Sequence, residues 1–447
     1  MHTFVTRAIL TAACLGTTAC STVVRTAVDY CDLRRMETQI PLEQRVQLVE
    51  DRLFSEFYYP DIGLISHYNE RKDEQTQKGP LQLEQNAHLL VALAKKYEVT
   101  KDEQTLARAK KLIDGFLYMD KLNDLDGFLP MEVRLQNDKT YLLKPNTPSF
   151  GYTQLFYAYV LAKESFANTS VSENIAFHAN LIFERLAKDN FIVKNNKGKQ
   201  VEYSDASPTK TFMLTSSHIE SLAFATAGRY LVDKYTNPGL HEKLKSVEHT
   251  LRVTYGYDTR PALLKVNLGI YRVPTPSTSW LDLMKLAIIY HTTKHEKYAK
   301  HIVDLAKSYA DDKNPFFITM HLQHGNESMQ EKKKLAQIAL ERLQTYPITN
   351  TSQEVINSTG ASTRLIPRFV KNQAEKETTQ PLPIWATSGD TYQWKRNPYR
   401  IQGNIGEDGS KIFNAVDLYE VYWMLQSQTR TRTESVATTT SERKTAL

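Results

Sequence analysis

Residues 120–133 read DKLNDLDGFLPMEV, in which acids and an asparagine surround one glycine. A related pattern, a glycine or an acid followed by large apolar residues, recurs along the chain. Its copies are DIGLISH at 61–67, LDGFLPM at 125–131, DNFIVKN at 189–195 and LGIYRVP at 268–274. Gly127 follows Gly63 by 64 residues, and Phe191 follows Phe128 by 63. A period of this length, with helix, turn, short strand and helix in each unit, indicates a repeat architecture.

Apolar residues recur at helical spacing through most of the chain. Helices are predicted near residues 42–57, 84–98, 103–119, 150–166, 174–187, 217–234, 239–254, 279–292, 294–310, 330–345 and 412–425. An outer layer facing water is indicated for the Lys- and Glu-rich helices with a narrow apolar stripe, at 103–119, 174–187, 239–254 and 294–310. A buried inner layer is indicated for the more apolar and aromatic helices, at 84–98, 150–166, 217–234, 279–292 and 412–425.

This alternation of layers resembles the (α/α)6 toroid of the six-hairpin glycosidase superfamily over about residues 40–425. The resemblance implies an all-α fold, in which six inner and six outer helices form a closed ring with short strand-like connections. Eleven helices are predicted where the toroid needs twelve, so the missing inner helix is expected near 316–325 or 353–370.

The first residues have the layout of a secretory signal peptide, because Arg7 precedes a short apolar run that ends in small residues. The small residues before Cys20 resemble a bacterial lipobox, although Thr17 stands where that family has leucine. The resemblance implies a signal peptide at 1–19, a lipidated Cys20 that anchors the protein to a membrane, and a tether at 20–40. Ser21 then favours an outer-membrane lipoprotein over the alternative, a plainly cleaved periplasmic or secreted protein.

The composition, 41% hydrophobic and 24% charged, is that of a globular protein with a large core. Since no Pro- or Gly-rich linker divides residues 40–345, one toroid domain is expected at 41–425. The net charge of +6 comes from dispersed Lys and Arg, which favours a solvated surface over a polyanion-binding face. The segment 426–447 lacks a periodic apolar face and is predicted to be a disordered tail.

The opening stretch allows three interpretations. As a calcium loop it has the wrong ligand spacing, since EF-hand ligands alternate around a central glycine and end in glutamate. As a turn, Asp126-Gly127 suits a tight bend with positive φ. Asp126 also replaces the apolar Ile62 and Leu268 of the corresponding copies, so it is a candidate carboxylate added to a scaffold turn. The turn and the catalytic carboxylate both remain open.

Inner helices that run parallel place their N-termini at one end of the ring, which we call the mouth. Serines and threonines there are explained as N-caps. That role does not explain the acidic, aromatic and histidine residues, which are the candidates Glu84, Tyr152, His218, Glu220, Trp280 and Asp282. Converging helix N-termini would also favour an anionic ligand.

The segment PLPIWATSGDTYQWKRNPYRIQGN, 381–404, is predicted to be a loop before the last inner helix. Aromatic faces stack on sugars and arginine forks bind carboxylates, so the loop supplies candidate substrate contacts. They are Trp385, Asp390, Tyr392, Trp394, Arg396 and Arg400, to which Tyr68 is added. The alternative is a buried aromatic plug that closes the ring. Single-stranded nucleic acid also suits such a pattern, but a secreted compartment argues against it.

These observations predict a cell-envelope enzyme acting on an acidic polysaccharide by hydrolysis, elimination or epimerisation. Hydrolysis needs two carboxyls beside the glycosidic bond, for which Asp126, Glu220 and Asp282 are candidates. His218 or Tyr152 would then serve in proton transfer. Elimination or epimerisation would need a tyrosine or histidine base and a cation on the sugar carboxylate, for which His218, Tyr68, Tyr392, Arg396 and Arg400 are candidates.

The alternative is a non-catalytic envelope lipoprotein that binds glycan or protein. An enzyme should place two or more carboxyls within reach of one sugar, whereas a binder should line the mouth with aromatics and pair its carboxyls with Lys or Arg. The histidines show no zinc-ligand spacing with cysteine, and no GxGxxG or GxxxxGK motif occurs. No metal or cofactor is therefore predicted.

Overall fold

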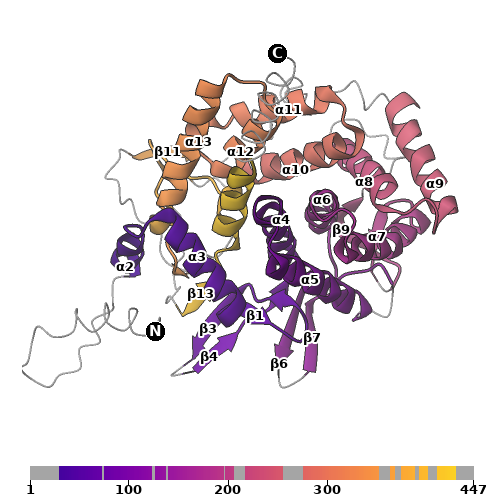
Figure 1. The fold of residues 1–447 in the computed structure, drawn as a ribbon, viewed down its shortest axis with the longest axis horizontal. Helices are drawn as coiled ribbons and strands as arrows, with labels where there is room; N and C mark the ends of the chain where they lie inside the picture. Colours follow the sequence, from indigo (N-terminus) through magenta and orange to yellow (C-terminus); the bar gives the residue numbers. More distant parts are fainter. Residues whose placement is uncertain are drawn as a thin grey trace, which may run out of the picture.

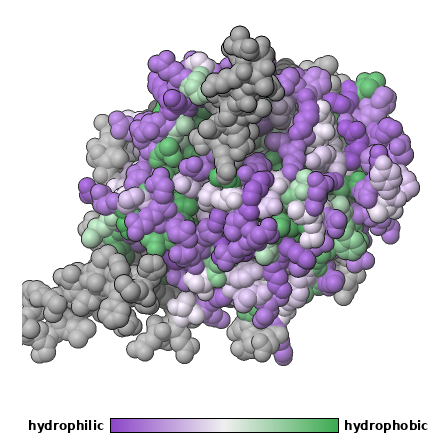
Figure 2. All heavy atoms as spheres, viewed as in Figure 1, coloured by the Kyte–Doolittle hydropathy of each residue, from purple (hydrophilic) through white to green (hydrophobic). Residues whose placement is uncertain are grey.

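The protein is described from a computed structural model. The described residues are 30–72, 75–122, 126–136, 139–195, 197–205, 217–254, 275–351, 363–367, 374–387, 392–400 and 410–428. Cys20, Asp390 and the predicted tail beyond residue 428 lie outside them. Among the described residues, no helix is both long and apolar enough to cross a membrane. The face seen in Figure 2 is largely hydrophilic, with small scattered apolar areas.

The helices form two concentric layers, as Figure 1 shows. The inner layer comprises α4 (Leu83–Thr100), α6 (Ser149–Ser165), α8 (Ser217–Leu231), α10 (Pro276–Thr293), α12 (Pro315–His324) and a last helix at 416–428. The outer layer comprises α3 (Leu42–Arg52), α5 (Glu103–Lys121), α7 (Ser170–Lys188), α9 (Pro238–His249), α11 (Glu296–Lys307) and α13 (Met329–Gln344). The two layers alternate along the chain, so the fold is the predicted all-α (α/α)6 toroid. The twelfth helix, α12, occupies the first of its two predicted positions.

Short strands lie in most of the described connections from an outer helix to the next inner helix, whereas the connection from α11 to α12 holds only the 3₁₀ helix η4 (Ala310–Asp312). Between α3 and α4 lie β1 (Tyr58–Tyr59), β2 (Leu64–Ile65), β3 (Tyr68–Lys72), β4 (Gln75–Lys78) and β5 (Leu81–Gln82). Later connections hold β6 (Glu132–Gln136), β7 (Lys139–Lys144), β8 (Ile192–Lys194) and β9 (Gln200–Asp205). The last holds β10 (Asn350–Thr351), β11 (Thr363–Pro367), β12 (Ala374–Thr378) and β13 (Lys411–Phe413). These strands lie at the N-terminal end of the inner helices, which is the mouth of the ring.

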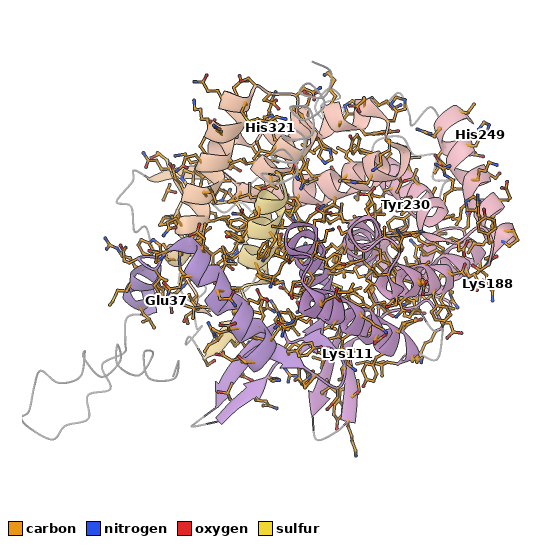
Figure 3. The ribbon with its side chains drawn as sticks, viewed as in Figure 1. Glu37, Lys111, Lys188, Tyr230, His249 and His321 are labelled. Atoms are coloured by element: carbon orange, nitrogen blue, oxygen red, sulfur yellow. The ribbon has the colours of Figure 1, made fainter. Side chains whose placement is uncertain are left out.

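The first and last parts of the chain close the ring. β13 pairs with β3, which joins the last connection to the first. The short helix α2 (Tyr30–Glu37) packs nearby, where buried Arg34 donates a hydrogen bond of 2.7 Å to the carbonyl of Thr387. Glu37, labelled in Figure 3, accepts one of 2.7 Å from the backbone N–H of Thr349. Residues 30–40, assigned to the tether from the sequence, therefore belong to the folded domain, and the helix that ends the domain runs to residue 428.

The glycine of the repeated motif has a backbone role in both described copies. Gly63 and Gly127 have φ of +90° and +80°. A Cβ atom on Gly63 would lie 2.0 Å from the carbonyl oxygen of Lys111 in α5, and one on Gly127 would lie 2.3 Å from that of Leu181 in α7. Each turn thus packs against the backbone of the following outer helix, which a side chain would prevent. The turn at Gly127 is therefore part of the scaffold.

Replacing Gly127 by Ala is expected to lower the free energy of unfolding by about 2 kcal/mol or more, because positive φ and the contact with Leu181 both oppose a Cβ. Urea unfolding measures this loss. Gly198→Ala is the matched control, since Gly198 also has positive φ, at +73°, but has no neighbouring atom within 4 Å of the added Cβ. Equal losses in the two variants would contradict a role for the α7 contact.

Candidate active site

Two carboxylates and one lysine meet between neighbouring inner helices near the mouth. Lys285 Nζ on α10 lies 3.5 Å from Glu220 Oε1 on α8 and 3.6 Å from Asp282 Oδ1, one turn earlier on α10. The hydroxyl of Thr153 on α6 donates a hydrogen bond of 3.4 Å to Glu220 Oε1. Because both carboxylate oxygens lie within 3.6 Å of one nitrogen, they are at most about 7 Å apart, a limit that allows the roughly 5–5.5 Å separation of a retaining glycosidase pair.

The electrostatics of this cluster keep Lys285 charged. Glu220 and Asp282 are each 7% exposed and Lys285 is 4% exposed, so the three groups are almost removed from water. Burial alone would lower the pKa of Lys285, but the charges of Glu220 and Asp282 together raise it above its ordinary value. One ammonium therefore faces two carboxylates.

A second acid–lysine pair lies at the start of α4. Glu84 Oε1 accepts a hydrogen bond of 2.5 Å from Lys395 Nζ, which belongs to the short 3₁₀ helix η6 (Gln393–Lys395). Burial would raise the pKa of Glu84, but Lys395 lowers it below its ordinary value. Lys395 Nζ also lies 5.7 Å from the ring centre of Trp280, so the pair adjoins the aromatic residue that begins α10.

A buried histidine network lies beside Trp280. Glu420 on the last helix accepts a hydrogen bond of 3.0 Å from His88 Nδ1 on α4, and another from the Tyr392 hydroxyl. The rings of His88 and Tyr392 stack with centroids 4.2 Å apart, and Trp280 lies 5.4 Å from His88. Neither His88 Nε2 nor Trp280 Nε1 has a hydrogen-bond partner in the described part of the chain. Each is a buried polar atom whose hydrogen-bonding capacity the described residues leave unused.

The sequence did not single out His88, Glu420 or Lys285. Each is a titratable residue within a largely apolar stretch that predicts an inner helix. A titratable residue within an apolar stretch could have identified them in the sequence. A charged residue on a helix that is buried around its circumference needs a polar partner.

The loop 381–404 acts partly as the predicted plug. Tyr392 and Trp394 are each 2% exposed. Trp394 Nε1 donates a hydrogen bond of 2.8 Å to the carbonyl of Asp417, and Asn314 Nδ2 donates one of 2.8 Å to the carbonyl of Trp394. Both aromatic side chains are thus packed inside the toroid. Only a structural rearrangement would bring a sugar onto their faces.

The other candidate contacts are more accessible. Trp385, Arg396 and Arg400 are half-buried, and Trp385 lies under the guanidinium of Arg35 at 5.6 Å. Half-buried Tyr68, on β3, accepts a hydrogen bond of 3.2 Å from Arg134 Nη2.

The remaining candidates divide between scaffold and surface. Tyr152 is buried, and its hydroxyl donates a hydrogen bond of 3.4 Å to the carbonyl of Gly127 while accepting one of 3.3 Å from the N–H of Leu129. It therefore fixes the repeated turn. Asp126 lies exposed on that turn. His218 belongs to α8, but its side chain lies outside the described atoms.

A buried acid–histidine–tyrosine network supports the same turn. His178 Nε2 on α7 lies 3.7 Å from Asp120 Oδ2 on α5, and His178 Nδ1 is 2.6 Å from the Tyr159 hydroxyl on α6. Burial raises the pKa of Asp120 to about 6, although the backbone N–H groups of Gly127 and Phe128 oppose the rise. Burial lowers the pKa of His178 to about 3.

Replacing Asp120 by Asn is expected to make the protein more sensitive to acid. A raised Asp120 pKa means that its contribution to stability is full below pH 3.8 and is lost as pH rises to about 6. A lowered His178 pKa has the opposite sign, since its contribution is full above pH 6.5 and is lost as pH falls to about 3. Between about pH 4 and 6, acidification increases the stability that Asp120 contributes and decreases the stability that His178 contributes. The variant keeps only the His178 contribution.

The measurement is urea unfolding at pH 4, 5, 6 and 7. Between pH 6 and 4 the variant should lose about 2–3 kcal/mol more than the wild type. Asp61→Asn, at an exposed acid of the first repeat, is the control and should follow the wild type. A parallel pH profile for the Asp120 variant would contradict the assignment.

The described residues hold no group of three or more His, Cys, Asp or Glu that could bind a metal ion. The mouth therefore offers carboxylates, lysines, an imidazole and aromatic faces as its chemical groups. Such groups can transfer protons, stabilise charge and stack on sugar rings.

No protein-family model matches the chain, and no curated protein matches it in sequence. Among solved structures, the chain is similar to an inactive variant of an alpha-1,6-mannanase of Salegentibacter sp. HEL1_6 in complex with alpha-1,6-mannotriose. The TM-score is 0.45 at 12% identity, over 87% of this chain and 99% of the other. It is also similar to an endoglucanase from the termite Nasutitermes takasagoensis, with a TM-score of 0.44 at 10% identity over 90% of this chain and 99% of the other. For an unsaturated glucuronyl hydrolase specific for heparin, the TM-score is 0.41 at 11% identity over 90% of this chain and 98% of the other. Likeness at this level does not identify a reaction.

Proposed function

We propose that the protein is a carbohydrate-active enzyme of the cell envelope that hydrolyses a polysaccharide, with Glu220 and Asp282 as its catalytic carboxyls. The observation that carries the proposal is the meeting of these two acids, at most about 7 Å apart, on adjacent inner helices near the mouth. Hydrolysis of a glycosidic bond needs one carboxyl as general acid and a second as base or nucleophile.

The surroundings supply the other functions that such a reaction needs. Lys285 and Thr153 hold the two carboxylates in place, and rigid positioning of this kind is a large part of catalysis. One carboxyl must take up a proton and leave Lys285 before it acts as an acid. Asp126, exposed on a scaffold turn, is the weakest of the three carboxyls proposed from the sequence.

The acidic character of the substrate and the envelope location belong to the same proposal. The N-termini of inner helices that open at the mouth favour a negatively charged sugar. Half-buried Arg396 and Arg400 follow η6 in sequence and are the proposed contacts of its carboxylate. The signal peptide and the lipidated Cys20 would keep the enzyme at the membrane surface, where it meets envelope or external glycans.

A non-catalytic glycan- or protein-binding lipoprotein is the second candidate. The observation in its favour is that Glu84 is paired with Lys395, while Glu220 and Asp282 share Lys285. A binding protein would keep its buried carboxyls neutralised in this way.

One assay separates the candidates. Purified protein is incubated with acidic and neutral polysaccharides, and reducing ends and unsaturated-uronate absorbance are followed together. Reducing ends without absorbance are expected. Both signals would replace hydrolysis by elimination, and neither signal with saturable binding to one glycan would favour the binding protein. Exchange of solvent deuterium into the sugar without cleavage would indicate epimerisation.

A further inference from the structure

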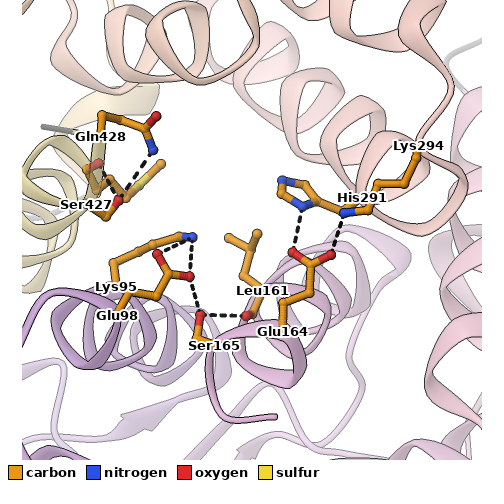
Figure 4. Close-up of polar contacts among 10 residues, drawn as sticks. Lys95, Glu98, Leu161, Glu164, Ser165, His291, Lys294, Ser427 and Gln428 are labelled. Carbon is orange, nitrogen blue, oxygen red and sulfur yellow. Dashed lines mark hydrogen bonds and ion pairs between the residues drawn. The ribbon is translucent and has the colours of Figure 1, made fainter. Parts of the chain in front are cut away.

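A second polar cluster lies at the opposite end of the ring, where the inner helices end. Figure 4 shows it in close-up. α4 contributes Lys95 and Glu98, and α6 contributes Glu164. α10 contributes His291, near its end, and Lys294 follows as its C-cap. The mouth and its carboxyl pair are not part of this cluster, because they lie at the helix N-termini.

The cluster consists of two separate sets of polar contacts. Lys95 Nζ donates hydrogen bonds of 2.8 and 3.0 Å to the two carboxylate oxygens of Glu98. Glu164 accepts one of 2.9 Å from His291 Nδ1 and one of 2.6 Å from Lys294 Nζ. Lys95 and His291 approach the middle of the ring from opposite sides (Figure 4). The rim is open to solvent, since the Lys294 side chain is 62% exposed.

His324, at the end of α12, completes the cluster but has no polar partner there. Both of its ring nitrogens are buried, and neither has a hydrogen-bond partner among the described residues. The ring instead packs edge-on against Tyr290 and His291, at centroid distances of 4.8 and 5.7 Å. A buried imidazole without partners is unfavourable, so its retention calls for an explanation.

The titratable side chains that face His324 are two lysines and a second histidine. Burial lowers the pKa of His324 far below its ordinary value, and His291, Lys95 and Lys294 lower it further. The carboxylates of the cluster are engaged with Lys95, Lys294 and His291. His324 is therefore a neutral donor and acceptor placed among groups that attract an anion.

We propose that this end of the ring is a binding site for a small oxyanion, a sulfate, phosphate or carboxylate group, held by His324 with Lys95 and Lys294. The negative ends of the inner helices oppose an anion here and explain why lysines gather near them. With two lysines matched by two glutamates, the site needs one more positive charge. Protonation of His324 supplies it, so the protein takes up a proton as it binds the anion.

Inorganic sulfate is the probe, because its charge does not change between pH 5.5 and 7.5. Sulfate is titrated into the full-length protein while the carbon-13 signals of the histidine rings are followed by NMR. Saturable binding that shifts the His324 ring signal is expected, with affinity rising about tenfold for each pH unit of acidification. His324→Gln should bind at least about tenfold more weakly at pH 5.5 and should lose the pH dependence, because glutamine takes up no proton.

Two further variants complete the test. Lys294→Gln changes the exposed rim without touching the core, and it should weaken sulfate binding while keeping the pH dependence. His249→Gln, at an exposed histidine that ends α9 on the outer layer, is the matched control and should bind as the wild type does. Absence of saturation at pH 5.5, or wild-type binding by both His324→Gln and Lys294→Gln, would overturn the proposal. None of these outcomes depends on polysaccharide hydrolysis at the mouth.

Discussion

Glu220→Gln and Asp282→Asn are each expected to lower kcat for polysaccharide hydrolysis by about 10³-fold, the order of effect of removing a general acid or base. Each amide keeps the size of the carboxyl but can neither hold nor deliver the proton that the glycosidic oxygen requires. KM should change little, since binding rests on the aromatic and cationic residues of the mouth. Initial rates of reducing-end formation measure the effect on the glycan that the wild type cleaves.

The controls separate chemistry from folding. Asp126→Asn, at the exposed carboxyl of the scaffold turn, should retain activity within about tenfold. Circular dichroism and urea unfolding show whether the Glu220 and Asp282 variants remain folded. Full activity in either amide variant would remove that residue from the reaction. A large loss in Asp126→Asn alone would transfer the catalytic role to the turn.

Lys285→Met is expected to produce the largest loss of stability, about 3–5 kcal/mol, because it removes the ammonium that two nearly buried carboxylates share. Methionine fills a similar volume, so little of the loss would come from packing. Urea unfolding of the wild type and the variant measures it.

A combined variant isolates the electrostatic cause. Adding Glu220→Gln and Asp282→Asn to Lys285→Met removes the uncompensated charges and should restore most of the lost stability, since the effects of residues in contact are not additive. Lys300→Met is the control, at a lysine with a 75% exposed side chain on α11, and it should change stability by less than about 1 kcal/mol. Failure of the combined variant to recover would mean that packing, rather than charge, gives Lys285 its importance.

The repeat could be predicted because its causes are local. The glycine turn needs positive φ and a side-chain-free contact with the next outer helix, so Gly63 and Gly127 recur at a fixed spacing. Outer helices show an apolar stripe because one face meets water. α12 was the ambiguous element, since it has only ten residues and is buried around its circumference, which leaves no amphipathic pattern to read.

The candidate site was predicted only in part. The sequence indicated four of its residues, because polar and aromatic residues at the start of apolar helices are recognisable: Glu84, Glu220, Trp280 and Asp282. Their partners did not stand out. Lys395 lies 311 residues from Glu84, and Glu420 lies 332 residues from His88. Tyr392 and Trp394 are residue types that commonly stack on sugars. Only their burial in the structure shows that they pack within the toroid.

The sequence by itself determined the all-α repeat, the order of inner and outer helices and the end of the ring at which acids gather, since these follow from short-range periodicity and turn geometry. Only the tertiary structure decided which charges meet. Packing of α8 against α10 brings Glu220 onto Lys285, which already lies one turn from Asp282. At the far end, it leaves His324 beside two lysines. The physical reason is that a buried polar or charged group is stabilised by its nearest partner, and for Glu220, Glu84 and His88 that partner lies on another element.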